Sequence, residues 1–580
     1  MALAVELAPE IALELDRFES QVTDYLEGRL DEEVFRPIRL TNGIYGIRQG
    51  NNLQMVRVKI PHGRVNAEQL DMLAHIAEEY GRGFGHITTR QNVQLHFVPL
   101  ERTPDAMRLI ASVGMTTREA CGDTVRNIVG CPLAGVCRTE LFDVTAWARE
   151  TTKFLLRHPL SQRLPRKFKI NFSGCENDCG QGMINDIGAI ATRSPDGEFG
   201  FKLVVGGGLG ANPFPAQLLE PFTPFEDLII TIESILRVFD RTGIRTNHLR
   251  ARMKWVVDSM GIEDFRQAVF TERNKMRSVV GPLAPHGIPK GLDPDAFGDS
   301  ERETPAPSIP KRVDGDGYEA WLQSNTIPQR QDGLHVAFAT MRLGDLTASQ
   351  FRAVAGIARN YGSGDIRLTQ RQNLAIRDVP ESQLPAIYEI LESNKMARIG
   401  RIRDVVSCPG ADTCNLAVTQ SRGLAKAVGD HLDAEGLGGV DGISINISGC
   451  SNSCGQHHIS DIGFMGLERR IDGNSAPGYQ LFLGGGIIGE EHVEFGKRTL
   501  RVGAKRAPEV VAALVRKYLD ERQDGEDFKG WVKRIGAKSI AESLEEIARI
   551  RSVADAPDDY VDWDELEQFQ VKLGRGECAT

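Results

Sequence analysis

The sequence predicts an α+β protein that contains two copies of one structural plan. Eight of its ten cysteines form two sets with the same order and spacing, and several short motifs outside these sets recur in the same order. The offset between matching positions stays between 275 residues (Cys175 to Cys450) and 281 residues (Tyr80 to Tyr361). A near-constant offset of this size indicates duplication of a whole half, in contrast to a short-period repeat.

Each half begins with a predicted strand, a helix and a second strand. In the first half, alternating apolar and polar residues predict strands at 53–60 and 93–97, and a periodic apolar face predicts a helix at 68–79. The second half repeats this order with strands at 334–340 and 373–377 and a helix at 348–358. A mixed region with cysteines follows in both halves, so we expect two α+β domains per half.

Composition indicates an ordinary globular protein of the cytoplasm. The chain of 580 residues is too long for a single core, and 41% hydrophobic with 26% charged residues is typical of globular domains. A net charge of −10 argues against a dedicated nucleic-acid binder. The sequence shows no secretory signal and no run of about 18 apolar residues, so we expect no membrane span. In a reducing compartment, the cysteines favour metal ligation over disulfides.

The two cysteine sets have the composition of iron–sulfur sites. Each set is a Cys-x5-Cys pair followed by a Cys-x3-Cys pair, namely Cys131, Cys137, Cys175 and Cys179 in the first half and Cys408, Cys414, Cys450 and Cys454 in the second. Four thiolates are the number that a cubane cluster requires, and neither spacing is that of the usual structural zinc sites. The sequence therefore predicts iron–sulfur clusters.

The second cysteine set lies in two longer motifs, SCPGADTC (407–414) and GCSNSCGQHH (449–458). These motifs resemble the cluster signature of the sulfite and nitrite reductases that couple sirohaem to a [4Fe–4S] cluster. The resemblance extends from about Ile38 to about Arg551. It implies the pseudo-twofold duplicated fold of that family, with ferredoxin-like half-domains and sirohaem/[4Fe–4S] domains. It also implies that Cys454 bridges the cluster to the sirohaem iron.

This plan divides the chain into consecutive segments. We expect an N-terminal extension (1–37), a ferredoxin-like half-domain (38–118), a sirohaem/[4Fe–4S] domain (119–281), a linker (282–317), a second half-domain (318–398), a second sirohaem/[4Fe–4S] domain (399–551) and a C-terminal tail (552–580). The linker is assigned from its Pro, Gly and charged residues.

The resemblance also implies a set of substrate-binding cations, whose counterparts here are Arg57, Arg126, Lys167 and Lys169. The arginines are expected to clamp the oxygens of the anion, and the lysines to neutralise charge and deliver protons. Any one of them alone would more often be a solvated surface cation. Arg90, Asn92 and His96 match positions that contact sirohaem carboxylates in the family, although a lone histidine on a strand is more often structural.

The predicted reaction is the six-electron reduction of sulfite to sulfide. In the family, Lys-x-Lys is typical of sulfite reductases and Lys-x-Asn of nitrite reductases, and Lys167-Phe168-Lys169 has the sulfite form. A second cation also suits dianionic sulfite better than monoanionic nitrite. The alternative within the same chemistry is reduction of nitrite to ammonia. The alternative from another class is a non-catalytic iron–sulfur electron-transfer or zinc-scaffold protein, which needs no anion clamp.

The two halves are not equivalent in charge. By the repeat offset, Arg126 corresponds to Arg403, but the other three cations correspond to Phe338, Gly442 and Ser444. In the family, each site combines the cluster of one half with anion-binding residues of the other, so we expect one anion site, beside the second-half cluster. The first-half cysteines are interpreted as a second [4Fe–4S] cluster, with vestigial thiols or a structural zinc as alternatives. Whether a second sirohaem accompanies them is left open.

A separate protein is expected to donate the electrons. The glycine-rich segment 206–210 lacks the Gly-x-Gly-x-x-Gly spacing of dinucleotide-binding loops, so binding of NAD(P) or flavin is rejected. The donor is then ferredoxin or a flavoprotein reductase, and neither a nucleic-acid nor a membrane partner is expected. Tyr45 and Cys121 fall near the expected site. A thioether between them has analogues in part of the family, but an unlinked buried thiol beside an aromatic ring is favoured.

Overall fold

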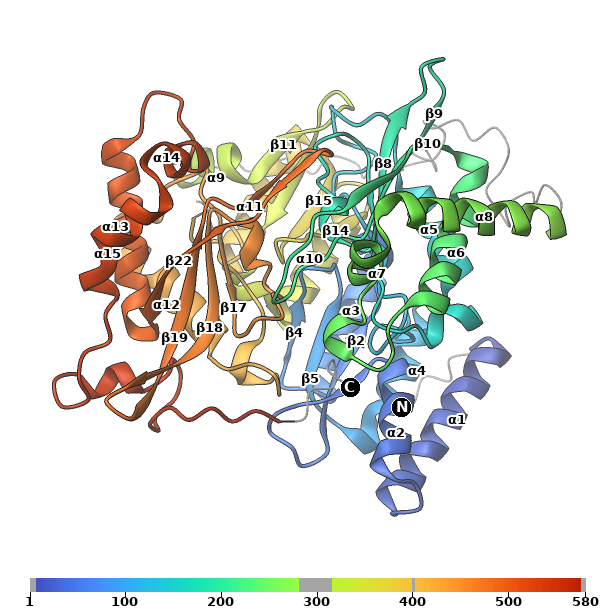
Figure 1. The fold of residues 1–580 in the computed structure, drawn as a ribbon, viewed down its shortest axis with the longest axis horizontal. Helices are drawn as coiled ribbons and strands as arrows, with labels where there is room; N and C mark the ends of the chain where they lie inside the picture. Colours follow the sequence, from blue (N-terminus) through green and yellow to red (C-terminus); the bar gives the residue numbers. More distant parts are fainter. Residues whose placement is uncertain (1–6, 281–315, 399–401, 575–580) are drawn as a thin grey trace.

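The computed structural model describes residues 7–280, 316–398 and 402–574 (Figure 1). Its first half contains the predicted elements as β2 (Leu53–Val58), α3 (Ala67–Glu79) and β5 (Val93–Pro99). The second half repeats them as β12 (Leu334–Ala339), α10 (Ala348–Asn360) and β15 (Leu374–Pro380). The duplicated α+β plan is therefore confirmed. Residues 282–315 of the predicted linker, residues 399–401 and Cys578 lie outside the described residues.

The two halves exchange strands between their first sheets. One sheet has the order β1 (Ile44–Gly46), β2, β5, β4 (Phe84–Ile87) and β13 (Asp345–Thr347). The other has the order β11 (Thr326–Pro328), β12, β15, β14 (Ile366–Leu368) and β3 (Arg64–Val65). In each sheet the last strand comes from the other half, with Leu346 opposite Gly85 and Val65 opposite Ile366. Neither sheet is complete without both halves.

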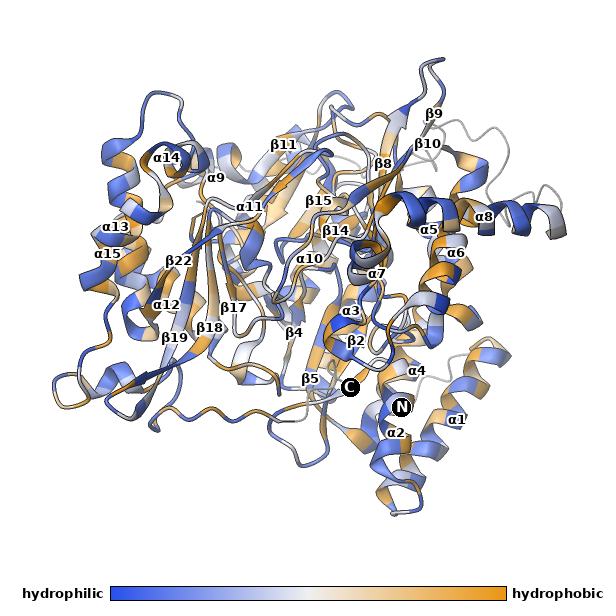
Figure 2. Cartoon of the chain, in the orientation of Figure 1, coloured by the Kyte–Doolittle hydropathy of each residue, from blue (hydrophilic) through white to orange (hydrophobic). Residues whose placement is uncertain are grey.

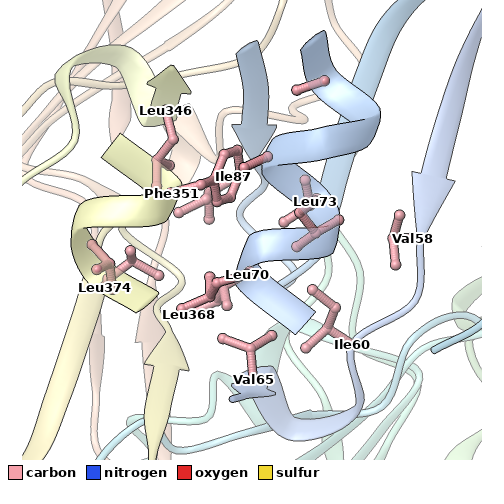
Figure 3. Packing of buried hydrophobic residues seen from close by; sticks show 14 of the residues in the cluster. Val58, Ile60, Val65, Leu70, Leu73, Ile87, Leu346, Phe351, Leu368 and Leu374 are labelled. Atoms are coloured by element: carbon pink, nitrogen blue, oxygen red, sulfur yellow. The ribbon is translucent and has the colours of Figure 1, made fainter. Parts of the chain in front are cut away.

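Helices α3 and α10 pack against each other over this shared core. Both helices begin with a capping box, formed by Asn66 and Gln69 in α3 and by Thr347 and Gln350 in α10. Figure 3 shows Phe351 of α10 beside Ile87 and Leu346, among side chains from both halves. Gly85 lies opposite this ring, and a Cβ atom there would crowd Phe351 at 3.0 Å.

The second sheet of each half presents cysteines at the ends of parallel strands. The first-half sheet contains β6 (Val129–Gly130), β7 (Ile170–Ser173), β8 (Ile187–Arg193), β9 (Phe199–Val205) and β10 (Gln217–Pro224). The second-half sheet contains β16 (Val406–Ser407), β17 (Ile445–Ser448), β18 (Ile462–Ile471), β19 (Asn474–Leu483) and β22 (Lys497–Gly503). The first three strands of each sheet are parallel. Because parallel strands end at one edge, each Cys-x5-Cys loop emerges beside its Cys-x3-Cys loop.

Helices cover the outer faces of these two sheets. In the first half they are α5 (Thr145–Leu155), α6 (Phe225–Thr242), α7 (Met253–Met260) and α8 (Ile262–Val280), and in the second α12 (Ser421–Ala434), α13 (Ala507–Glu521), α14 (Phe528–Ile535) and α15 (Ala537–Ala548). Hydrophobic and hydrophilic residues both occur along them (Figure 2), and Val511, Leu514 and Tyr518 of α13 are buried, as expected for helices with one face on a core.

The remaining helices surround the first sheets. They are α1 (Pro9–Leu26), α2 (Glu32–Thr41), α4 (Thr103–Ser112), α9 (Asp316–Asn325) and α11 (Leu384–Ser393), and a short hairpin joins β20 (Gly486–Ile488) to β21 (His492–Glu494). Figure 1 shows the two cysteine-bearing sheets on opposite sides of the strands of the first sheets. Among the described residues, no helix is long and apolar enough to cross a bilayer.

Replacing Phe351 by Ala should destabilise the whole chain. The ring is 1% exposed and contacts elements of both halves, so its loss leaves a cavity in the shared core. We expect the free energy of unfolding, measured by chemical denaturation, to fall by ~3–5 kcal/mol. The control is Arg352→Ala on the next residue, whose ion pair with Glu78 is exposed to solvent and should contribute little to the free energy of unfolding. An equal effect of both variants would contradict the shared core.

Candidate functional site

A large cavity lies between the two halves and is lined by residues from both. The space between its walls is about 1630 Å³ when the part open to solvent is included. Its basic lining residues come from the first half and are Arg57, Arg90, Arg126, Lys167, Lys169 and Arg252. Its cysteines come from the second half and are Cys408, Cys414, Cys450 and Cys454. The cavity thus combines the predicted cations with the second cysteine set.

Local strand geometry directs both lysines to the cavity. Residues 167–169 run beside the segment that precedes β6, where the backbone N–H of Arg126 donates to the Phe168 carbonyl (2.9 Å). Side chains alternate in extended backbone, so Lys167 and Lys169 share one side while Phe168 is fully buried on the other. The Lys-x-Lys spacing therefore brings two amino groups to one side of the cavity.

The two predicted clamping arginines are held by one carbonyl. Arg126 Nη1 and Arg57 Nη1 donate to the Ala120 carbonyl at 3.1 and 3.4 Å, and Arg126 Nε donates to the Gly122 carbonyl (3.0 Å). The Arg57 guanidinium also lies 5.2 Å from the centre of the Tyr45 ring. These contacts orient both guanidinium groups without an anion.

A tight loop between β4 and β5 carries Arg90 and contacts the second cysteine set. Gln91 adopts a left-handed conformation (φ 54°). Arg90 Nη1 donates to the side-chain oxygens of Asn171 and Asn185 (3.1 Å each). The hydroxyl of Thr89 donates to the Cys454 carbonyl (3.0 Å), so this first-half loop touches the last cysteine of the second-half set.

The cavity carries an excess of positive charge. None of the described residues that line it is Asp or Glu. Behind the lining, Asp186 is fully buried and accepts from Arg252 Nη2 (2.8 Å) and from the backbone N–H of Lys169 (3.0 Å). Burial, and then the charge of Arg90, lowers the pKa of Lys169 well below its ordinary value. An anion in the cavity would relieve this repulsion.

Several buried polar atoms at the cavity have no hydrogen-bond partner. They include Arg90 Nε, Asn92 Oδ1 and both ring nitrogens of His96. Burial lowers the pKa of His96 well below its ordinary value, so its imidazole is neutral and offers one donor and one acceptor. Unsatisfied buried polar groups are rare in native proteins. The N–H groups of Arg90 and His96 among them fit a ligand that carries carboxylates, as sirohaem does, whereas Asn92 Oδ1 can only accept a hydrogen bond.

The second cysteine set converges at the cavity. Cys408 Sγ accepts from the Gly449 N–H (3.3 Å) and lies 3.3 Å from Ser421 Oγ. Burial, followed by the charges of Cys454 and Cys408, raises the pKa of the Cys450 thiol. In the described part of the chain, no three His, Cys, Asp or Glu side chains are arranged to hold a single metal ion. A cubane separates its cysteines more widely, because each thiolate binds a different iron.

The first cysteine set forms its own group away from this cavity. Cys131 and Cys175 are buried, whereas Cys179 is exposed. The neighbouring thiol of Cys131 raises the pKa of Cys179 to about 12, and the neighbouring thiol of Cys179 raises that of Cys175. None of the four predicted first-half ligands lines the cavity.

The second-half counterparts of the cations do not form an equivalent site. Phe338 packs with Val336 and Ala375 against Val136 of the first cysteine loop. Arg403 forms an ion pair with Asp433 (2.6 Å). The Ser444 hydroxyl donates to Asp461 (2.7 Å), and Gly442 has no side chain. Apolar side chains therefore stand at the place that corresponds to Arg57.

Sequence reasoning missed Arg252 and Thr89 at the cavity. Arg252 directly precedes α7 and belongs to no motif that the repeat or the resemblance singled out. Thr89 has no sequence signal that marks it as a binding residue. Tyr45 and Cys121, whose cross-link was left open, lie in one small cluster of buried hydrophobic residues.

Known protein families match four segments of the chain. The nitrite and sulphite reductase 4Fe-4S domain matches residues 121–277 and 399–551. The nitrite/sulfite reductase ferredoxin-like half domain matches residues 45–113 and 327–394. Together these matches cover well over half of the 580 residues.

Similar proteins include reductases named for both anions. The assimilatory ferredoxin-dependent nitrite reductase of Haloferax mediterranei is 30% identical over 530 residues, which cover 87% of this chain and 86% of the relative. Sulfite reductase (ferredoxin) 1 of Mycolicibacterium paratuberculosis is 30% identical over 496 residues, with 84% and 83% coverage. The solved structure of the Mycobacterium tuberculosis NirA protein has a TM-score of 0.76 at 28% identity and covers 91% of this chain and 96% of its own.

Replacing Asp186 by Asn should destabilise the protein around the basic side chains that line the cavity. The change leaves the largely buried Arg252 without its carboxylate partner, and breaking a buried ion pair costs ~3–5 kcal/mol. The control is Asp461→Asn, the counterpart in the second half, whose buried carboxylate accepts from Ser444 in place of a basic residue. We expect Asp186→Asn to lower the free energy of unfolding more than Asp461→Asn in chemical denaturation. Equal losses would mean that Asp186 does not compensate the cations.

Proposed function

Because the chain belongs to the nitrite and sulfite reductase family, we propose that it reduces sulfite to sulfide by six electrons at a sirohaem and a [4Fe–4S] cluster in the cavity between its halves. One observation carries this proposal: six basic side chains of the first half and four cysteines of the second half line a single cavity. Neither an electron-transfer protein nor a zinc scaffold needs such an anion site.

In this proposal the second cysteine set would hold the catalytic cluster, and Cys454 would be the ligand shared with the sirohaem site. We assign Arg90, Asn92 and His96 to the sirohaem carboxylates, because all three line the cavity and Arg90 and His96 have unpaired buried N–H groups. When bound, the two groups supply the iron that receives the anion and the electrons that reduce it.

Arg57 and Arg126 bind the oxygens of the anion. Because both guanidinium groups are already oriented by the Ala120 carbonyl, little reorganisation is needed when charge develops. Lys167 and Lys169 neutralise the second negative charge and deliver protons. Burial favours the neutral amine of Lys169, so an entering anion promotes its protonation, and the ammonium can then protonate a departing oxygen.

The lysine pair favours sulfite as the substrate. Two ammonium groups on one wall neutralise a dianion better than a monoanion. Reduction of nitrite to ammonia is the second candidate, because relatives such as those of Haloferax mediterranei and Synechococcus elongatus are named nitrite reductases.

We further propose that the electrons come from ferredoxin. The names of the relatives support this donor over a flavoprotein reductase. We place the enzyme in the cytoplasm, where its thiols stay reduced. The first-half cysteines are proposed to hold a second [4Fe–4S] cluster.

The purified protein should show the absorption bands of sirohaem and contain the amount of iron that two clusters and one sirohaem require. Two clusters and one sirohaem give about nine irons per chain, one cluster and one sirohaem about five, and two of each about ten. We expect about nine, measured by elemental analysis on protein whose spectrum shows Soret and red-region bands. A colourless protein would refute the enzymatic proposal.

Lys169→Asn should shift the preference from sulfite towards nitrite. Loss of a charged hydrogen bond worth ~1.5–3 kcal/mol corresponds to ~10- to 100-fold in kcat/KM for sulfite relative to nitrite. Both substrates are assayed with the same chemical reductant, so that donor docking does not enter the ratio. The matched control is Ser444→Asn, the counterpart in the second half, which should leave the ratio unchanged. A constant ratio in Lys169→Asn would remove the support for sulfite.

A further inference from the structure

We infer that the first-half cysteines hold an electron-storing iron–sulfur centre without a tetrapyrrole, and that Gln181 and Gln456 form the contact through which it exchanges electrons with the catalytic cluster. This inference rests on the proposed function for the identity of the catalytic cluster.

The backbone of the cluster-binding loop is the same in both halves. In the first half, the N–H of Gly180 donates to Ser173 Oγ (3.0 Å), and in the second the N–H of Gly455 donates to Ser448 Oγ (3.1 Å). Added Cβ atoms at both glycines would lie 2.1 Å from a carbonyl oxygen of the preceding strand. The chain therefore retains, in the first half, the tight turn that presents the last cysteine of each set.

The four first-half thiols gather at this turn. Cys179 lies near Cys131 and Cys175. Thr139 connects Cys137 to this group, because its hydroxyl lies 3.3 Å from Cys137 Sγ and 4.0 Å from Cys175 Sγ. A vestigial set of thiols would have no need to keep all four ligands, their turn and their mutual approach.

The place of a second tetrapyrrole is filled by protein. Val336, Phe338 and Ala375 pack with Val136 in an apolar cluster. The backbone closes over it, since the N–H of Arg330 donates to the Val136 carbonyl (2.9 Å) and Gln331 Nε2 donates to the Gly135 carbonyl (3.0 Å). With no tetrapyrrole and no set of anion-binding cations beside it, a cluster here cannot reduce sulfite itself. Its remaining chemistry is to store and transfer electrons.

A reciprocal amide pair joins the two cysteine loops. Gln456 Nε2 donates to Gln181 Oε1 (2.8 Å), and Gln181 Nε2 donates to Gln456 Oε1 (3.3 Å). Each glutamine follows the last cysteine of its set by two residues and has a left-handed backbone, with φ of 64° at Gln181 and 61° at Gln456. The path from Cys179 to Cys454 thus runs through two short peptide segments and one hydrogen-bonded contact.

The proposed redox step transfers one electron. A one-electron iron–sulfur donor protein reduces the first-half cluster, which returns to its oxidised state when that electron passes to the oxidised catalytic cluster. No bond forms or breaks. Because sulfite needs six electrons that arrive one at a time, a stored electron beside the catalytic cluster shortens the time between successive reduction steps.

The first test removes the centre. Cys175→Ser and, as a second variant in case the buried change impairs folding, Cys179→Ser should lower the iron content from about nine to about five per chain while the sirohaem bands remain. An unchanged iron content, or a wild-type content of about five, would refute a first-half cluster and leave the proposed function standing. Loss of one sirohaem equivalent with the iron would refute a centre without a tetrapyrrole. Absence of sirohaem bands in the wild type would instead refute the proposed function.

The second test breaks the contact. Gln181→Ala should keep the iron content and spectrum of the wild type but slow electron exchange between the clusters at least about tenfold, followed by rapid-freeze electron paramagnetic resonance after partial reduction. Gln181→Glu keeps the reach and one acceptor for Gln456 Nε2, so it should restore most of the rate. Equal exchange rates in the wild type and Gln181→Ala would refute the amide pair as the route.

Discussion

Strand exchange between the halves is the constraint on which the remaining structure depends. The β13 strand completes the sheet of β4, and β3 completes the sheet of β14, so the two halves share one hydrophobic core. Two buried glutamines extend this connection. Gln91 bonds to Gly130 and Leu368, and Gln372 bonds to Ile87 and Ser407, which places the beginning of each cysteine loop against strands of both halves. The shared core therefore holds the basic side chains of the cavity and the cysteines opposite them in fixed positions.

Duplication supplied two equal scaffolds, and a few side chains made them unequal. A buried aspartate stands at the same place in both halves, but Asp186 compensates Arg252 whereas Asp461 accepts from Ser444. An arginine in one half is replaced by Phe338 in the other, and the space is closed by apolar packing. Changes at these positions leave the excess of positive charge on one side only, while the backbone that presents the cysteines stays the same.

Much of the fold and the site could be predicted from sequence, because those parts depend on spacing. The cysteine sets and the alternating or helical patterns of the first half follow local rules, and α3 and β5 begin within a residue of their predicted limits. The exchange of β3 and β13 could not be predicted, since strands of two and three residues carry no pattern. Arg252 was missed because only its tertiary partner, Asp186, identifies it. The sequence shows that Phe338 replaces a positive charge at the position of Arg57. The apolar packing around Phe338 depends on contacts between distant segments, so it could not be predicted.

The exchanged strands also determine when the protein can fold. During synthesis, β4 leaves the ribosome long before β13, the strand that pairs with its edge, has been made, and Val65 likewise precedes its partner Ile366. Until then the edge of β4 is unpaired and part of the apolar surface of α3 is uncovered, a state that invites aggregation. Domains usually fold one after another from the N-terminus, but here the first sheet must wait for the second half. We therefore expect the nascent first half to depend on chaperones, and its separate expression to give insoluble protein.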